Sequence, residues 1–294
     1  MKTVFVILAV ALILIALYVF FVEPLWVMPL LERMTPNILY RVRTKERLVA
    51  LSFDDGPNPK FTPQVFALLH QYDAKATFFL IGERAERHPE LMRRILAEGH
   101  EVGNHWWRDG TVLGQSEKGF VEGLERTERT IELAADGKEG PLQTPRHGLG
   151  QEAGLTTKES QDPGSEGEPG TSKRKKLFRP PGGVARPSQL RLAKERGYTS
   201  VLGCAYPHDP MKTPVWYQRW LIEKNLAPGT IVILHDGIKD PTRSIETLRQ
   251  ILAEGKQRGL KFVSIGELID ASDDHVSRAA GREKGMESRK NQQK

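Results

Sequence analysis

Hydrophobic and polar positions alternate in blocks along most of the chain. Short runs rich in β-branched and aromatic residues are separated by stretches in which apolar residues recur with the helical period. Strands that alternate with helices in this way predict β-α-β units and a parallel sheet. Seven strands in such an α/β chain could close into a barrel or form an open doubly wound sheet, and the periodicity does not choose between these folds. The predicted strands cover residues 47–53, 75–81, 100–104, 176–180, 199–204, 230–235 and 261–265.

The N-terminal block differs from the rest because it is apolar throughout. Residues 4–22 contain no charge, glycine or proline, and they approach the roughly 20 residues that a membrane-crossing helix requires. The run is longer than the core of a cleaved signal peptide, and no A-x-A-like cleavage site follows it. The sequence therefore predicts one transmembrane helix as an uncleaved anchor over residues 1–23, with the membrane as a partner and a single-pass membrane localisation.

Composition divides the remaining chain into a connector, one domain, an insertion and a tail. A connector with three prolines covers residues 24–46, and the alternating strands and helices occupy 47–271. Residues 136–175 are dense in Gly, Pro, Glu and Lys and contain no aromatic residue, so they cannot bury enough apolar surface to offset the entropy of ordering. This pattern predicts a disordered insertion, although an error in the gene model could also produce it. Residues 272–294 predict a disordered basic tail.

Composition and charge exclude some classes of function. The 294 residues are 39% hydrophobic and 27% charged, which is ordinary for a globular protein. The single cysteine, Cys204, excludes an internal disulfide and a thiolate metal cluster. The net charge is +6, but part of it lies in the C-terminal tail. No basic stripe interleaved with aromatic residues occurs, so we expect no nucleic acid partner.

Polar residues that can carry chemistry follow the C-terminal ends of the predicted strands. In parallel α/β folds these strand ends form the face where ligands bind. Adjacent carboxylates in an Asp-Gly-Pro context could be a simple turn. They could also be one ligand of a divalent metal and a neighbouring general base, while a histidine across the cleft protonates a leaving group, which suggests hydrolysis of an amide or ester. The residues in question are Asp54, Asp55, His105, Arg179, Asp209 and His235.

Four motifs resemble those of one known family. "LSFDDGPNP", "GHEVGNH", "FRPPGG" and "IVILHDG" are similar, in order and approximate spacing, to the motifs of the polysaccharide deacetylase family, also called the NodB-homology or carbohydrate esterase family four domain. The resemblance covers about residues 47–270. It implies a distorted (β/α) barrel of about seven parallel strands and one divalent metal. It also implies removal of acetyl groups from N-acetylglucosamine polymers, with chitin-like polymers as the first expectation and a luminal or extracellular domain.

The resemblance also implies roles for the proton-transfer residues. Asp54 is similar to the catalytic base, and Arg179 to the residue that orients this base through a charge-assisted hydrogen bond. His235 resembles the general acid. Asp209 is similar to the acidic residue that adjusts this histidine. These four residues are therefore the expected catalytic set.

The same resemblance implies a metal site and a substrate site. Asp55 and His105 are similar to two metal ligands. Pro181 and Gly182 occupy the place where a backbone N–H stabilises the oxyanion. Leu234 resembles the wall of the acetyl pocket.

Three departures from the family pattern affect these expectations. Asp109 replaces the second metal-binding histidine, four residues after His105; on a helix it would share a face with His105 and could still reach the metal. Its extra negative charge would shift the preference from zinc towards manganese or cobalt, whereas as a mere helix cap it would leave the metal site impaired. Gly182 replaces an aromatic residue and widens the groove. The usual tryptophan motif reads "LGCAYPHDP", although Trp216 and Trp220 follow soon after.

The sequence thus favours a membrane-anchored, metal-dependent deacetylase of N-acetylated polysaccharide or oligosaccharide. The first alternative is a catalytically impaired pseudoenzyme that binds a glycan. The second is an amidase or esterase that acts on a small molecule or an O-acetylated sugar. Trp106 and Trp107 could stack on a sugar ring, but tandem aromatic residues beside a strand end more commonly serve packing.

Overall fold

A parallel β-sheet organises the part of the chain that the computed structural model describes, residues 2–22, 25–137 and 174–272. Every predicted strand overlaps an observed one, and each pairing between named strands is parallel. The sheet order is β1-β6-β5-β4-β3-β2-β7, and β8 pairs with β2 outside this path. The strands are β1 (Ile38–Leu39), β2 (Leu48–Gly56), β3 (Ala76–Leu80), β4 (Glu101–Asn104), β5 (Leu177–Phe178), β6 (Thr199–Val201), β7 (Ile231–His235) and β8 (Lys261–Val263).

Two isolated bridges connect the ends of this sheet. Arg41, just after β1, forms an antiparallel bridge with Thr230, just before β7. Ala205, beyond β6, forms a parallel bridge with Val232 of β7. The sheet therefore curls into a distorted (β/α) barrel, which decides between the two folds that periodicity left open.

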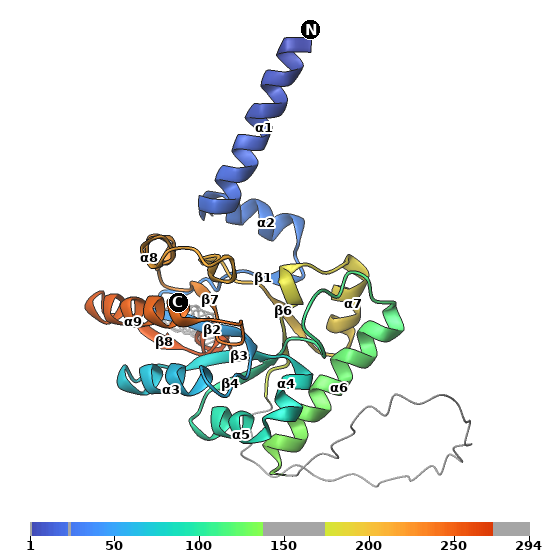
Figure 1. Ribbon diagram of the computed structural model, residues 1–294, viewed down its shortest axis with the longest axis vertical. Coiled ribbons are helices and arrows are strands. Elements are labelled where there is room, and N and C mark those ends of the chain that lie inside the picture. The colour runs from blue at the N-terminus through green and yellow to red at the C-terminus, as the bar shows by residue number, and fades with distance from the viewer. Residues whose placement is uncertain (1, 23–24, 138–173, 273–294) are drawn as a thin grey trace, which may run out of the picture.

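Helices cover the outside of the curled sheet (Figure 1). Several fill the crossovers between consecutive parallel strands, as β-α-β connections require. α8 and α9 are packed against each other. The helices of the barrel are α3 (Thr62–Gln71), α4 (Gly82–Arg87), α5 (Pro89–Ala97), α6 (Glu117–Ala135), α7 (Pro187–Glu195), α8 (Val215–Asn225) and α9 (Thr242–Gln257).

Successive side chains of strand β2 point alternately to the outside and to the inside of the barrel. Leu51 and Phe53 point outward into the largest apolar cluster, where the ring of Phe53 lies 5.1 Å from that of Phe78. Ser52 and Asp54 point inward, and both accept hydrogen bonds from a side chain that reaches them across the barrel. The period of two along a strand thus places a carboxylate inside the barrel while its neighbours stabilise the outer layer.

The predicted connector becomes part of the fold. It contains α2 (Met28–Met34) and the short strand β1, which pairs with β6 and was not predicted. Arg41 donates to Glu32 at 2.8 Å, and the Leu202 amide donates to the Leu39 carbonyl at 2.9 Å. These contacts fix the segment against the C-terminal end of β6.

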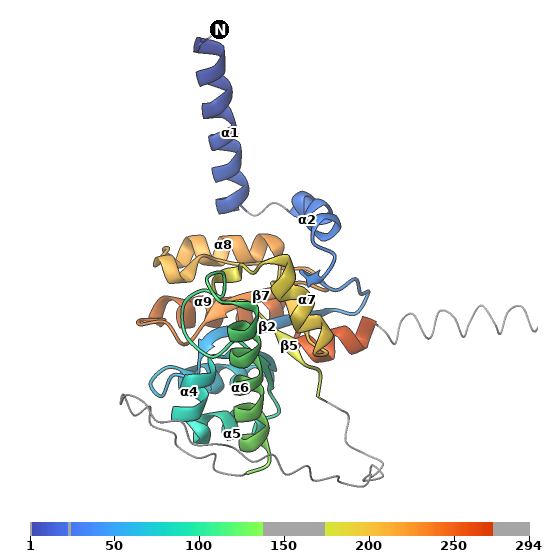
Figure 2. The same cartoon turned by 90° about the vertical axis from the view of Figure 1, so that its right-hand side faces the viewer.

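The N-terminal helix α1 (Lys2–Val22) extends away from the barrel in both views (Figures 1 and 2). Among the described residues, no helix has the combined length and apolar character that a membrane crossing requires. This finding contradicts the predicted single-pass membrane localisation, the transmembrane helix and the membrane partner.

Two further predictions fall largely outside the described residues. The predicted insertion at 136–175 overlaps them only at its two ends, and the predicted tail at 272–294 only at its first residue.

Candidate functional site

Two neighbouring carboxylates reach the same cavity because strand β2 is irregular at its end. On a regular strand, Asp54 and Asp55 would point to opposite faces. The pairing of β2 with β3 shifts register between Asp54 and Gly56, and Asp55 has a φ of 66°, in the left-handed region. Such a bulge re-aims a side chain. Both carboxylates therefore line one cavity of about 550 Å³.

Arg179 fixes the first carboxylate. Its Nη1 donates to Asp54 Oδ1 at 2.5 Å and to Ser52 Oγ at 2.8 Å, and its Nε donates to the Val201 carbonyl at 3.3 Å. Burial lowers the pKa of Arg179, and the charge of Asp54 opposes this effect. A charge-assisted bond of this kind sets the orientation of the carboxylate. Asp54 is only 4% exposed, so its orientation is tightly determined.

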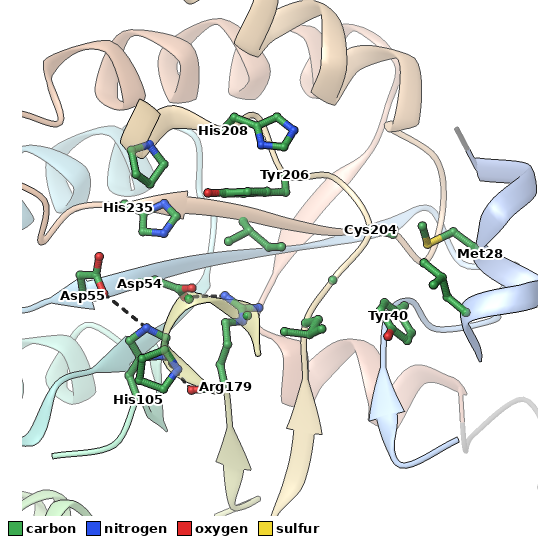
Figure 3. Close-up of a pocket in the computed structure, with 18 of the residues that line it drawn as sticks. Met28, Tyr40, Asp54, Asp55, His105, Arg179, Cys204, Tyr206, His208 and His235 are labelled. Atoms are coloured by element: carbon green, nitrogen blue, oxygen red, sulfur yellow. Dashed lines mark hydrogen bonds and ion pairs between the residues drawn. The ribbon is translucent and has the colours of Figure 1, made fainter. Parts of the chain in front are cut away.

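Asp55 and His105 form a pair of candidate metal donors. His105 Nδ1 donates to the Arg179 carbonyl at 2.8 Å, while its Nε2 lies 3.3 Å from Asp55 Oδ1 (Figure 3). His105 Nε2 therefore faces a carboxylate oxygen, an arrangement that places a proton or a cation between the two atoms. Burial opposes ionisation of Asp55, but the hydrogen bond and charge of His105, with His235 and Arg84, outweigh it and lower the pKa of Asp55 to about 2.

The donor chemistry of this pair suits a divalent metal. A carboxylate oxygen and an imidazole nitrogen are ligands that zinc, cobalt and manganese accept. Metal-binding histidines usually donate their other ring N–H to a carbonyl or carboxylate, as His105 does here. Within the described part of the chain, however, no group of three or more His, Cys, Asp or Glu side chains is arranged to hold an ion. Two donors fit, and the third is not in place.

Asp109, the predicted third ligand, is engaged elsewhere. Residues 105–109 do not form the helix that would place Asp109 over His105. Instead, Arg84 Nη2 donates to Asp109 Oδ2 at 2.6 Å, and the Asp109 side chain is 60% exposed. Arg84 Nη1 also donates to the carbonyls of Asp55 and Gly237, at 2.5 and 2.7 Å. Asp109 lines the cavity, but it would have to leave Arg84 to bind an ion.

His235 faces the carboxylates from the neighbouring strand. β2 and β7 pair Asp54 with His235. His235 Nδ1 donates to Asp209 Oδ1 at 2.9 Å, and the His235 amide donates to Asp209 Oδ2 at 3.0 Å. Burial lowers the pKa of His235, but the charge and hydrogen bond of Asp209, aided by Asp54 and Asp55, raise it to about 9. These contacts favour the protonated form of His235.

The predicted substrate residues separate into two groups. Pro181 and Gly182 form a 3-10 turn that lines the cavity. Gly182 has a φ of 67°, and a Cβ built there would meet nothing within 4 Å, so the groove is open at this point. Leu234 does not line the cavity: it is fully buried in the outer apolar cluster. Ile233 and His235, on the opposite face of β7, line the cavity instead.

Several site residues were not identified from the sequence. Tyr206 lines the cavity, and its ring lies 5.9 Å from that of His235. Ser244 Oγ donates to Asp209 Oδ2 at 2.6 Å and so completes the support of the histidine. No spacing rule connects residues this far apart along the chain, although Tyr206 does stand in the altered tryptophan motif. Trp106 and Trp107 are buried in a packing cluster.

Comparisons with known proteins find relatives of this chain. A family model for polysaccharide deacetylases matches residues 41–160. A peptidoglycan-N-acetylglucosamine deacetylase of Bacillus cereus is 35% identical over 237 residues, which cover 80% of this chain and 94% of that protein. A chitooligosaccharide deacetylase of a Bradyrhizobium species is 30% identical over 191 residues, 65% of this chain and 71% of that protein.

The fold is also similar to that of a solved structure. A family 4 acetyl xylan esterase from Clostridium thermocellum, in complex with a cobalt ion, is 27% identical with a TM-score of 0.59, covering 76% of this chain and 90% of that one. Sequence, cavity and comparisons together show that this chain belongs to the polysaccharide deacetylase family, carbohydrate esterase family 4.

Proposed function

We propose that the chain is a metal-dependent hydrolase that removes acetyl groups from N-acetylglucosamine residues of a polysaccharide. The observation that carries this proposal is a set of three pairs at one cavity: Asp54 with Arg179, Asp55 with His105, and His235 with Asp209, which supports the histidine from behind the cavity wall. Such a set combines a base, a cation site and an acid. The B. cereus relative has the higher identity of the two named above, so peptidoglycan is the first polymer to test and a chitin-like oligomer the second.

Asp54 acts as the general base. Arg179 holds Asp54 Oδ1, so the carboxylate is oriented to accept a proton from the attacking water. Because the guanidinium is buried beside it, the charge of the carboxylate is partly compensated before substrate arrives. The positive charge of Arg179 also reduces the repulsion between the adjacent carboxylates of Asp54 and Asp55.

Asp55 and His105 would hold the divalent cation, with Asp109 as a third ligand only after release from Arg84. A bound cation would polarise the acyl carbonyl and make water easier to deprotonate. With Asp109, the set would carry two carboxylates and one imidazole, a composition that favours cobalt or manganese more than an all-histidine set does.

His235 acts as the general acid. Asp209 accepts from its Nδ1, so the protonated ring keeps an Nε2–H to give to the departing amine. The turn at Pro181 and Gly182 lines the same cavity, and its backbone N–H stabilises the negative oxygen of the tetrahedral intermediate.

A glycan-binding pseudoenzyme is the second candidate. The observation that favours it is the ion pair between Arg84 and Asp109, which withholds the third ligand. Under this alternative the cavity would bind an N-acetylglucosamine oligomer without releasing acetate.

One experiment separates the two candidates. The full chain is incubated with cobalt and an N-acetylglucosamine tetramer, or with peptidoglycan, and acetate is measured beside metal content. The proposal predicts acetate release that Asp54→Asn abolishes, while Asp270→Asn, a change at an exposed carboxylate, preserves it. Binding of the oligomer with no acetate from the unmodified chain would overturn the enzyme proposal and support the pseudoenzyme.

A further inference from the structure

The cavity continues beyond the groups that the proposed reaction uses. Figure 3 shows Asp54, Asp55 and His235 at one end and Met28 and Tyr40 at the other. The far end is formed by residues of the predicted connector, which holds α2 and β1, and by the segment after β6. We call this part the apolar annex. Its residues are Val27, Met28, Leu31, Tyr40, Leu202 and Cys204.

The apolar annex is a packed part of the fold. Met28, Tyr40 and Cys204 are 7%, 8% and 3% exposed and belong to one apolar cluster, against which Leu31 and Leu202 pack. The Tyr40 hydroxyl shares a hydrogen bond of 2.8 Å with Thr35 Oγ1, so its polar atom is satisfied. Pairing of β1 with β6 ties the wall of the annex to the barrel. The shape of the annex is therefore set before any ligand arrives.

Close packing also fixes the passage between the annex and the catalytic groups. Gly203 has a φ of +106°, and a Cβ there would lie 2.9 Å from Ile233 Cγ1. The glycine lets the chain after β6 run against β7, next to His235. Gly203 and Ile233 both line the cavity, so the floor is continuous from the reacting centre to Met28.

The chemistry of the lining indicates what the annex can hold. A glycan carries hydroxyl groups that need hydrogen-bond partners, and burying them against aliphatic and thiol side chains would be unfavourable. The apolar part of an N-acyl amino sugar is its acyl chain, which starts at the reacting carbonyl. An acetyl group has only one methyl group, and its apolar surface is far smaller than the surface that the six side chains of the annex can cover.

We propose that the apolar annex receives the acyl chain of an amino-sugar glycan whose amide carries a chain longer than acetyl. The inference rests on the proposed function and specifies its substrate class. The reaction remains hydrolysis: water adds to the amide carbonyl, the C–N bond breaks, and the products are the free amine and the carboxylate of the longer acid. The glycan itself stays in the open groove beside Gly182.

A chain-length series tests this inference on the full chain with cobalt. The probes are glucosamine tetramers carrying N-acetyl, N-butyryl or N-hexanoyl groups, and the readout is free amine. Each methylene buried in the annex should raise kcat/KM roughly fourfold. A rate that is highest for N-acetyl and falls with length would overturn the inference and leave the proposed function standing. No amine from any tetramer would overturn the inference, and a failure to release acetate from peptidoglycan as well would overturn the proposed function.

Variants of helix α2 test whether the preference for longer acyl chains arises in the apolar annex. Met28→Trp fills the annex and should reduce the hexanoyl-to-acetyl ratio of kcat/KM to about one or below. Met34→Trp, at a methionine of the same helix that is 69% exposed, should keep the ratio of the unmodified chain. Leu31→Gln introduces polarity without extra bulk and should also reduce the ratio, in case Met28→Trp does not fold. A ratio unchanged in folded Met28→Trp or Leu31→Gln would overturn the inference.

Discussion

Replacement of Asp209 by asparagine should lower the pKa of His235 by more than two pH units. In the unmodified chain this pKa is raised from 6.5 to about 9. Burial opposes the rise, and the charge and hydrogen bond of Asp209 are the largest contributions that overcome it. Asparagine keeps the size of the side chain but removes the charge. The imidazole would then be buried beside a neutral amide, and burial alone lowers the pKa of a histidine.

The contribution of His235 protonation to the free energy of unfolding follows from the linkage between protonation and folding. The difference between 6.5 and about 9, at roughly 1.4 kcal/mol for each pH unit, amounts to roughly 3 kcal/mol. Because the pKa of the folded state is the higher one, this stabilisation is fully present below pH 6.5 and is lost as the pH rises through about 9. Asp209→Asn should abolish this loss, so its free energy of unfolding should vary far less across the same range.

Two assays measure the effect in metal-free protein. NMR of the imidazole protons gives the pKa of His235 directly, and urea unfolding between pH 6 and 10 gives the stability change. Asp270→Asn, at a side chain that is 63% exposed, serves as the control and should leave the His235 titration unchanged. A His235 that titrates near 6.5 in the unmodified chain, or whose pKa is the same in Asp209→Asn, would refute the reasoning.

Three further changes have definite expected outcomes. Arg179→Met leaves a buried carboxylate without its partner and should reduce the urea-derived free energy of unfolding by about 3–5 kcal/mol; a loss below about 1 kcal/mol would contradict this account of the pair. Gly237→Ala puts a Cβ 1.8 Å from the Asp55 carbonyl and should cost about 1–3 kcal/mol of stability, whereas Gly114→Ala, where a Cβ meets nothing within 4 Å, should leave Tm unchanged. Asp109→His should strengthen zinc binding in calorimetric titration, and an unchanged affinity would place residue 109 outside the metal site.

Local patterns in the sequence predicted the parallel strands and the face that carries the site, whereas the barrel was expected only from the resemblance to the family. Strand periodicity and turn residues are encoded within a few positions, so all seven predicted strands overlap observed ones. The rule that ligands bind at strand C-termini then brought Asp54, Asp55, His105, Arg179 and His235 to one cavity, where the structure has them.

The sequence did not predict contacts that depend on three-dimensional neighbours. Arg84 lies 25 positions before Asp109, and only the folded chain shows that the two are paired. The short β1 was missed because two residues give no periodicity. Leu234 could have been placed correctly from alternation alone, since it neighbours His235 on a strand and must therefore point to the other face. The prediction that Leu234 forms the wall of the acetyl pocket came from the resemblance to the family and not from strand alternation.

The central claim is that Asp55 and His105 hold one divalent cation between the base Asp54 and the acid His235. Calorimetric titration of cobalt into chelator-treated protein tests it most directly, with the unmodified chain compared to Asp55→Asn and His105→Gln. The account predicts one ion per unmodified chain and no measurable binding in either variant. Binding that persists in both variants with unchanged affinity would contradict the account.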